Sequence, residues 1–367
     1  MSAQPLQKAD DQILMVSAGF ERWLYENQCS LSFTTYQRGR LFFIGLRDDG
    51  RLWVQERFFE QSQGLWADHN QIWLGTHSQI WNLRNTLPAG MAAKDNNADR
   101  LYCPRMSFVT GALDIHDIGM ASDGSPLFVN TRYSCLARLD PNYSFRTVWK
   151  PSFISRLAPE DRCHLNGLAM DKGSPRYVTA LGRTDVADGW RENRQSGGIL
   201  MSVADNEIIT DRLSMPHSPR LYGDRLWLLN SGTGEFGHVD LDSGQFTPVC
   251  FCPGYARGLA FVGDYAVIGL SRPRNNQTFE DLPLEERLDE KGAAARCGLI
   301  VVDLESGDVV RWLRFQHTVD ELYEVAVIPG VRQPAALGLK DRDKLAGYVT
   351  VDMGGPDRPH SERTAAE

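Results

Sequence analysis

Residues 221–230 read Leu-Tyr-Gly-Asp-Arg-Leu-Trp-Leu-Leu-Asn, in which a tight glycine-containing turn separates an apolar pair from a longer apolar run. This pattern is a β-hairpin signal. It occurs seven times along the chain at intervals of about 40 to 60 residues, in copies that begin at Phe33, Gly64, Ile118, Leu168, Arg220, Leu259 and Val325. A unit repeated at this spacing indicates an array of similar sheets.

Most of these hairpins are followed by a third and a fourth β-rich run. Two units carry matching turns between their third and fourth runs. These turns are Asp-Leu-Asp-Ser-Gly at 240–244 and Asp-Leu-Glu-Ser-Gly at 303–307. Asp and Ser in such turns bond to the backbone, and Gly accepts a positive φ. Four strands per unit are typical of a propeller blade.

The fold class predicted is therefore all-β, a β-propeller of four-stranded antiparallel blades. Seven blades are expected, and six are the alternative because the second unit is short. We expect strands from the N- and C-terminal parts of the chain to close the ring. Residues 13–16 or 31–33 would supply the outer strand of the last unit, whose hairpin spans 325–337.

The chain has 367 residues, of which 42% are hydrophobic and 10% aromatic, enough for a large core in one domain. We predict an N-terminal extension over 1–30, with a short helix at 20–26 where Phe20, Trp23 and Leu24 follow helical spacing. The propeller would occupy 31–351, and the Pro-, Gly- and charge-rich residues 352–367 would form a disordered tail.

Charge and hydropathy exclude two classes of partner. The net charge is −8 with both signs interspersed. Proteins that bind the phosphates of nucleic acids normally need a basic face, so we expect no nucleic-acid partner. The chain has neither a basic segment followed by an apolar one near its start nor 18 consecutive apolar residues, so we expect a cytoplasmic protein without a membrane partner.

Seven cysteines, an odd number without a secretion signal, predict reduced thiols. Cys250 and Cys252 lie on the same face of a predicted strand, a spacing compatible with a metal or redox pair. We interpret them as packed small hydrophobic residues, with the metal or redox pair as the alternative.

The innermost strands of a propeller line its channel, so their first residues converge on one mouth. Counting back from each hairpin turn assigns five polar residues to one level of neighbouring units, namely Asp117, Asn166, His217, Arg257 and Glu324. His116, His164 and Glu321 lie one layer closer to the mouth. This ring predicts a pocket that orients a small-molecule substrate.

The residue types in the ring suggest two roles. Asp117, Asn166, His217 and Glu324 are candidate ligands of a divalent metal; oxygen ligands favour calcium, magnesium or manganese, whereas several histidines favour zinc or iron. The sequence does not choose between the sets, because a register slip of one residue exchanges the two faces of a strand.

Catalytic roles fall to His116, His164, His217 and Arg257. A histidine that does not bind metal would transfer protons, and Arg257 would clamp a carboxylate or phosphate. The alternative is structural: polar residues of the channel would bind water, and His–Asp pairs would join neighbouring blades.

Four strings carry a resemblance to a known family, namely Asp114–Ile115–His116–Asp117, Cys163–His164–Leu165–Asn166–Gly167, Met215–Pro216–His217–Ser218–Pro219–Arg220 and Arg257–Gly258–Leu259. Together they resemble an uncharacterised bacterial family of predicted propellers, from about residue 20 to 351. The resemblance implies a propeller and no named activity.

More distantly, Asn166–Gly167–Leu168–Ala169 resembles the start of an inner strand in the gluconolactonase, paraoxonase and strictosidine-synthase group. That resemblance implies a channel-bound calcium or related ion held by Glu324, Asn166 and Asp117. Amidating lyases and carotenoid-cleaving oxygenases, propellers with a histidine-bound metal, are a second analogy at the level of the fold.

Two function hypotheses follow. The first is a metal-dependent hydrolase, lyase or isomerase that acts on a small polar or anionic molecule in the channel. The alternative is a non-catalytic propeller that binds a peptide, glycan or protein partner. The oligomeric state is not determined by the sequence.

Overall fold

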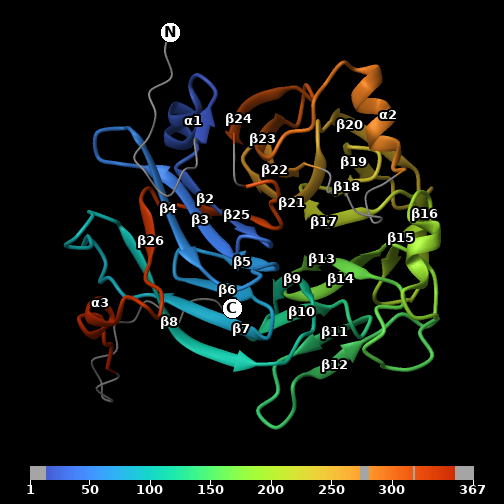
Figure 1. Ribbon diagram of the computed structural model, residues 1–367, viewed down its shortest axis with the longest axis horizontal. Helices are drawn as coiled ribbons and strands as arrows, with labels where there is room; N and C mark the ends of the chain where they lie inside the picture. The colour runs from blue at the N-terminus through green and yellow to red at the C-terminus, as the bar shows by residue number, and fades with distance from the viewer. Residues whose placement is uncertain (1–13, 273–280, 317–318, 352–367) are drawn as a thin grey trace.

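The computed structural model describes residues 14–272, 281–316 and 319–351. The predicted disordered tail, 352–367, lies outside the described residues, as do residues 1–13 of the predicted extension. Within these described ranges, the chain forms six antiparallel sheets that lie around a common axis (Figure 1). The propeller class and its four-stranded antiparallel blades are confirmed.

Each sheet contributes one innermost strand, and these are β5 (Leu65–Ala67), β9 (Ile115–Met120), β13 (Leu165–Asp171), β17 (Pro216–Tyr222), β21 (Tyr255–Val262) and β25 (Val325–Pro329). The second strands, in the same order of sheets, are β6 (Gln71–Gly75), β10 (Pro126–Asn130), β14 (Ser174–Ala180), β18 (Arg225–Asn230), β22 (Tyr265–Ser271) and β2 (Cys29–Thr35).

The third strands are β7 (Gln79–Asn85), β11 (Cys135–Arg138), β15 (Gly198–Ser202), β19 (Glu235–Val239), β23 (Gly298–Asp303) and β3 (Arg40–Leu46). The fourth strands are β8 (Arg100–Val109), β12 (Arg146–Trp149), β16 (Ile208–Leu213), β20 (Phe246–Phe251), β24 (Val309–Phe315) and β4 (Leu52–Phe58). Two sheets gain a fifth strand, because β1 (Leu14–Val16) pairs with β24 and β26 (Pro334–Ala336) pairs in parallel with β8.

The prediction of seven blades is wrong, because two of the seven sequence units belong to one sheet. Val325 of β25 pairs with Phe33 of β2, so the last unit supplies the innermost strand and the first unit the next three. Residues 334–336 do not complete a hairpin with β25 but extend the neighbouring sheet. The short second unit, which made six blades the alternative, nevertheless forms a complete sheet.

Four hydroxyl groups near the ends of second strands join neighbouring sheets. Thr34 donates to the Gln63 carbonyl at 2.6 Å, and Thr131 donates to the Leu165 carbonyl at 2.6 Å. Ser231 and Ser271 bond in the same way to the carbonyls of Ala256 and Leu322. These bonds satisfy buried carbonyls at the starts of inner strands, so they fix the mouth where the predicted ring lies.

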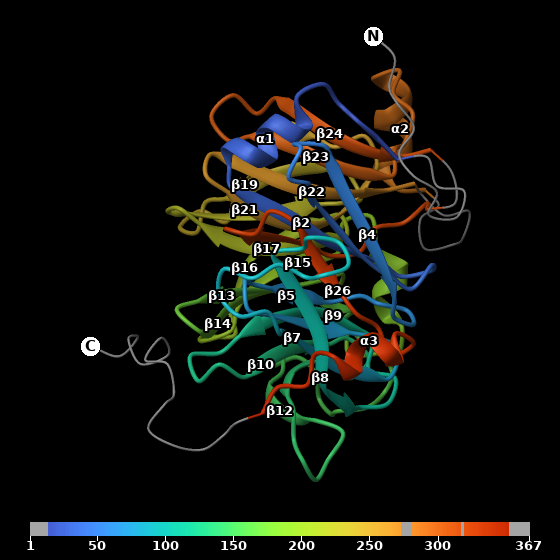
Figure 2. The ribbon, with the colours of Figure 1, turned by 90° about the vertical axis from the view of Figure 1, so that its left-hand side faces the viewer.

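Short helices lie outside the sheets. They are α1 (Phe20–Glu26), the 3₁₀ helix η1 (Gly189–Asn193), α2 (Pro283–Glu290) and α3 (Arg342–Ala346). Side chains of α2 and η1 pack in one apolar cluster with Tyr255 and Met215, and Figure 2 shows α2 projecting from the ring in the edge-on view. Among the described helices, none combines the length and apolar character needed to cross a membrane.

Candidate functional site

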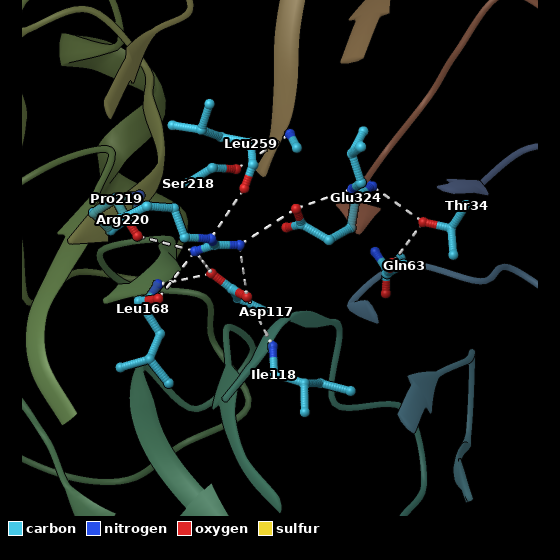
Figure 3. Close-up of polar contacts among 12 residues, drawn as sticks. Thr34, Gln63, Asp117, Ile118, Leu168, Ser218, Pro219, Arg220, Leu259 and Glu324 are labelled. Carbon is cyan, nitrogen blue, oxygen red and sulfur yellow. Dashed lines mark hydrogen bonds and ion pairs between the residues drawn. The ribbon is translucent and has the colours of Figure 1, made fainter. Parts of the chain in front are cut away.

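Arg220 lies at the centre of the channel between two carboxylates that come from distant parts of the chain (Figure 3). Its guanidinium bonds Asp117 in a bidentate manner, at 2.7 and 3.2 Å, and contacts Glu324 at 3.3 Å. The side chains of Asp117 and Glu324 are only 2% and 4% exposed. The three residues therefore form a buried ionic triad.

The remaining donors of Arg220 bond to backbone carbonyls of Leu168, Pro219 and Leu259. Asp117 also accepts the backbone N–H groups of Ile118 and Leu168 at 2.9 Å. The triad thus links β9, β13, β17, β21 and the residue before β25. We infer that its role is to hold the inner strands together.

Glu324 differs from Asp117 in its protonation. Burial and the nearby charge of Asp117 raise its pKa to about 8, although Arg220 acts in the opposite direction. One guanidinium cannot compensate two buried carboxylates fully, and Asp117 has the better hydrogen bonds. Glu324 therefore carries the proton of the pair at neutral pH.

This protonation predicts a pH-dependent stability. Because the pKa is raised, the folded protein keeps a proton on Glu324 at pH values where the unfolded chain, with a pKa of about 4.5, has released it. This extra bound proton favours the folded state at low pH, and the advantage is lost progressively as the pH rises toward 8. Between pH 5.5 and 7 the free energy of unfolding of the wild type should fall relative to Glu324→Gln by roughly 1.4 kcal/mol per pH unit, and the slope should diminish near pH 8. Urea titrations across this window measure the difference, and parallel pH profiles would contradict a protonated Glu324.

His116 and His217 have the same hydrogen-bonding arrangement at the mouth. The Nδ1 atom of His116 lies 3.0 Å from the Asp114 carbonyl and 2.8 Å from Thr131 Oγ1. The Nδ1 atom of His217 lies 2.8 Å from the Met215 carbonyl. A carbonyl only accepts, so each Nδ1 carries a hydrogen and each Nε2 is left with a lone pair.

Both imidazoles are neutral at physiological pH. Burial is the main cause that lowers the pKa of His116 to about 4, and burial together with the positive charge of Arg257 lowers the pKa of His217 well below its usual value. His217 Nε2 is buried and has no hydrogen-bond partner among the described residues. This Nε2 atom is a basic nitrogen to which no described residue of the protein donates a hydrogen bond.

His164 is held differently, by a carboxylate. Its Nδ1 lies 2.7 Å from Asp161 Oδ2, which also accepts the indole N–H of Trp190 at 3.0 Å. The His164 ring lies 4.4 Å from the Trp190 ring and 4.8 Å from the His116 ring, between centroids. His164 has a φ of 49°, a strained backbone conformation of the kind found at functional sites.

Arg257 connects His217 to the other two histidines. Its guanidinium lies over the rings of Tyr255 and Tyr323, at 5.0 and 4.8 Å from their centroids, and bonds Glu321 at 2.8 Å. Tyr255 contacts His217, and Tyr323 contacts His116. The mouth thus holds one continuous cluster of rings around a buried cation, which we call the histidine cluster: His116, His164, His217, Tyr255, Arg257 and Tyr323.

The single level expected for five polar residues divides into two layers. His217 and Arg257 join His116 and His164 in the histidine cluster, whereas Asp117 and Glu324 meet at Arg220. Asn166 joins neither group; its amide donates to the Pro216 carbonyl and accepts from Thr179, and so links two sheets. The two layers arise because the inner strands have register irregularities near their starts, such as those at 165–167 and 257–259. An irregularity of this kind shifts the residue that a count back from the hairpin turn assigns to a given level.

The residues predicted to bind a divalent metal do not fit that role as a set. Asp117 is paired with Arg220, whose charge takes the position a cation would need, and Asn166 is occupied by protein partners. Across the described ranges, no group of three or more His, Cys, Asp or Glu side chains is arranged to hold a metal ion. The divalent metal stays a prediction from sequence, and elemental analysis of the purified protein tests it.

Sequence reasoning assigned no role to Arg220, Tyr255 or Tyr323. Arg220 had a signal, since a charged residue within an inner strand, next to the channel, needs a partner there. The tyrosines had none, because aromatic residues such as Tyr255 at the start of β21 and Tyr323 just before β25 are usually core residues. Their contacts with Arg257 depend on how the strands meet.

Comparisons with known proteins identify the fold and a family. A family model described as "Domain of unknown function (DUF4915)" matches residues 18–337. No curated protein matches the sequence. A structure described as "Crystal structure of Nidogen/Laminin Complex" is similar with a TM-score of 0.51 and 11% identity, covering 82% of this chain and 98% of that chain.

A virginiamycin B lyase from Staphylococcus aureus superposes with a TM-score of 0.42 and 13% identity, covering 72% of this chain and 80% of that chain. The 11% identity with the first of these structures concerns the fold alone and says nothing about shared chemistry.

Proposed function

The chain belongs to the DUF4915 family, and we propose that this propeller is an enzyme that transfers protons on a small anionic molecule bound at the histidine cluster. The resemblance of its motifs to an uncharacterised propeller family is in keeping with the family match. The support for an activity comes from the side chains at the mouth, because the family description names no function.

The observation that carries the proposal is the state of His217. A buried imidazole with a fixed Nδ1–H, a lowered pKa and an Nε2 atom without a partner among the described residues is an available base. Buried polar atoms are normally satisfied by the protein, and exceptions often have a catalytic role. His217 therefore has the properties of a general base.

Arg257 supplies the recognition of a negative charge. Its guanidinium is buried between two tyrosine rings, and its planar fork suits a carboxylate. A carboxylate that exchanges with Glu321 at Arg257 would have His217 on the Tyr255 side and His116 on the Tyr323 side. This arrangement favours small carboxylic acids as substrates.

Imidazoles on both sides of the anchor suit reactions that remove a proton beside a carboxylate and return one elsewhere. His217 would accept the proton, and the Asp161-bound His164 would deliver one. Isomerases and lyases share this step, and a hydrolase would use the same base to activate water. Within these classes we favour an isomerase or lyase because the cluster provides a base, a second proton carrier and an anion anchor.

Ligand binding tests the anchor. Arg257→Gln should bind a small carboxylate about 10- to 100-fold more weakly than the wild type, since a charged hydrogen bond is lost. The measurement is a thermal-shift screen of mono- and dicarboxylic acids, followed by calorimetry of the acids that stabilise the wild type.

Arg57→Gln is the matched control, because Arg57 lies on β4 in a different sheet, is partly buried and pairs with Asp341. It should leave carboxylate binding unchanged. Equal affinity in the wild type and Arg257→Gln would contradict an anion site at Arg257. A partner protein whose binding survives changes at both Arg257 and His217 would instead support the non-catalytic alternative.

A further inference from the structure

A cavity lies inside the ring on the side of the ionic triad away from the histidine cluster. Its volume is about 350 Å³, and all six innermost strands line it, namely β5, β9, β13, β17, β21 and β25. The histidine cluster lies at the starts of these strands, whereas the lining residues lie further along them, as 118–120 do on β9 and 259–261 on β21. Arg220 of the triad also lines this space, which we call the distal cavity.

The distal cavity offers a ligand few hydrogen bonds. Arg220 is the one charged side chain among the described residues that line it. Its nitrogens already donate to three backbone carbonyls and to both carboxylates of the triad. The Tyr222 hydroxyl donates to the Gly263 carbonyl at 2.7 Å, and the Tyr222 ring stacks on Phe261 at 4.5 Å between centroids. An anion in this cavity would therefore find no free donor on Arg220 or Tyr222.

Arg220 still offers a ligand the face of its guanidinium. The N–H groups of a guanidinium lie in its plane, and here protein acceptors occupy that plane, yet 21% of the side chain is exposed. The face of a guanidinium attracts aromatic rings through cation–π and stacking interactions. An aromatic ligand gains from this face, whereas an aliphatic ligand of the same size does not.

The wall of the distal cavity suits the same kind of ligand. Met120 and Met170 line it on β9 and β13, and the thioether sulfur of methionine makes favourable contacts with aromatic rings. Gly119 leaves room for one of them, because a Cβ atom at this position would lie 2.7 Å from the Met170 sulfur. A cavity of about 150 Å³ holds one benzene molecule. The larger volume of the distal cavity therefore has room for two fused rings.

We propose that the distal cavity binds an uncharged aromatic molecule of one or two rings, with a ring stacked on the Arg220 guanidinium and bordered by Met120 and Met170. This ligand belongs to a chemical class different from the anion proposed for Arg257. The triad lies between the two sites, so each is testable without the other.

A matched pair of neutral alcohols tests the class of ligand. Benzyl alcohol and cyclohexylmethanol each carry one hydroxymethyl group on a six-membered ring, and only the first ring is aromatic. NMR titration of the full-length protein, isotope-labelled at its methionine methyl groups, measures both affinities. Benzyl alcohol should bind about 5- to 30-fold more tightly, the range that a desolvated cation–π contact gives. Equal affinities would contradict an aromatic site.

The methionine methyl signals also locate the bound ring. The signals of Met120 and Met170 should shift on addition of benzyl alcohol, because the ring current acts on neighbouring methyl groups. Met215, whose carbonyl bonds His217 at the histidine cluster, should not shift. Shifts at Met215 alone, or no shift at Met120 and Met170, would overturn the proposal.

Filling the distal cavity gives an independent test. Val327→Trp, at a partly buried lining position on β25, should weaken benzyl alcohol binding about tenfold or more. Val309→Trp is the matched control, because Val309 is exposed on the outer strand β24. It should bind as the wild type does, and so should Arg257→Gln. If thermal unfolding shows that Val327→Trp does not fold, Ala67→Trp on β5 fills the same cavity. Wild-type affinity in a folded filling variant would overturn the proposal.

Discussion

Replacing Arg220 with methionine is expected to lower the free energy of unfolding by about 3–5 kcal/mol, the usual cost of removing one partner from a buried ion pair. Asp117 and Glu324 would remain buried without their cation, and the carbonyls of Leu168 and Leu259 would lose a donor. Since domains are typically stable by about 5–15 kcal/mol, the variant should be close to unfolding. Denaturant titration followed by tryptophan fluorescence measures the loss.

An exposed ion pair provides the control for Arg220. Arg138 and Asp123 are 3.0 Å apart with side chains 37% and 57% exposed, so Arg138→Met should cost less than about 1 kcal/mol. Arg220→Lys keeps the charge but loses the bidentate geometry, and we expect an intermediate loss. If Arg220→Met unfolds at the denaturant concentration of the wild type, the triad does not hold the inner strands together.

Replacing His217 with glutamine is expected to reduce kcat about 10²- to 10⁴-fold for any carboxylate that the enzyme converts, which is the typical contribution of a general base. Glutamine can still donate to the Met215 carbonyl but cannot accept a proton at neutral pH. Carboxylate affinity should change little, because Arg257 provides the anchor. Turnover and calorimetric binding of the same compound separate these two effects.

The pH dependence gives an independent readout. A lowered pKa keeps His217 in its basic form below its usual value, so kcat should remain constant as pH falls from about 8 to 6.5. His238→Gln is the control, because His238 lies on β19 beside Trp227, outside the histidine cluster. A His217→Gln enzyme with wild-type turnover would rule out His217 as the base.

The repeat predicted the class of fold but not the number of blades. Alternation of apolar runs and turns marks hairpins, and a hairpin of strands two and three looks the same in sequence as one of strands one and two. The units at Phe33 and Val325 are an example, since they pair with each other in a single sheet. Residues 31–33, expected as an outer strand of the last unit, instead lie second in its sheet, next to the innermost strand β25.

The site was predicted as a set of residues and not as an arrangement. Polar residues at the starts of inner strands identified the mouth, and four of them lie in the histidine cluster. Counting from turns placed His217 and Arg257 at the level of Asp117 and Glu324, because irregular register near the starts of the inner strands changes which face a side chain occupies.

Local pattern alone determined that this chain makes antiparallel hairpins and that their polar first residues converge, since strand periodicity and turn chemistry are properties of neighbouring residues. Tertiary structure decided which strands share a sheet and which charges meet. Arg220 pairs with Asp117 across 103 positions of sequence, and burial at that meeting point gives Glu324 its proton. Desolvation and Coulomb interactions depend on distance in space, which the order of residues does not specify.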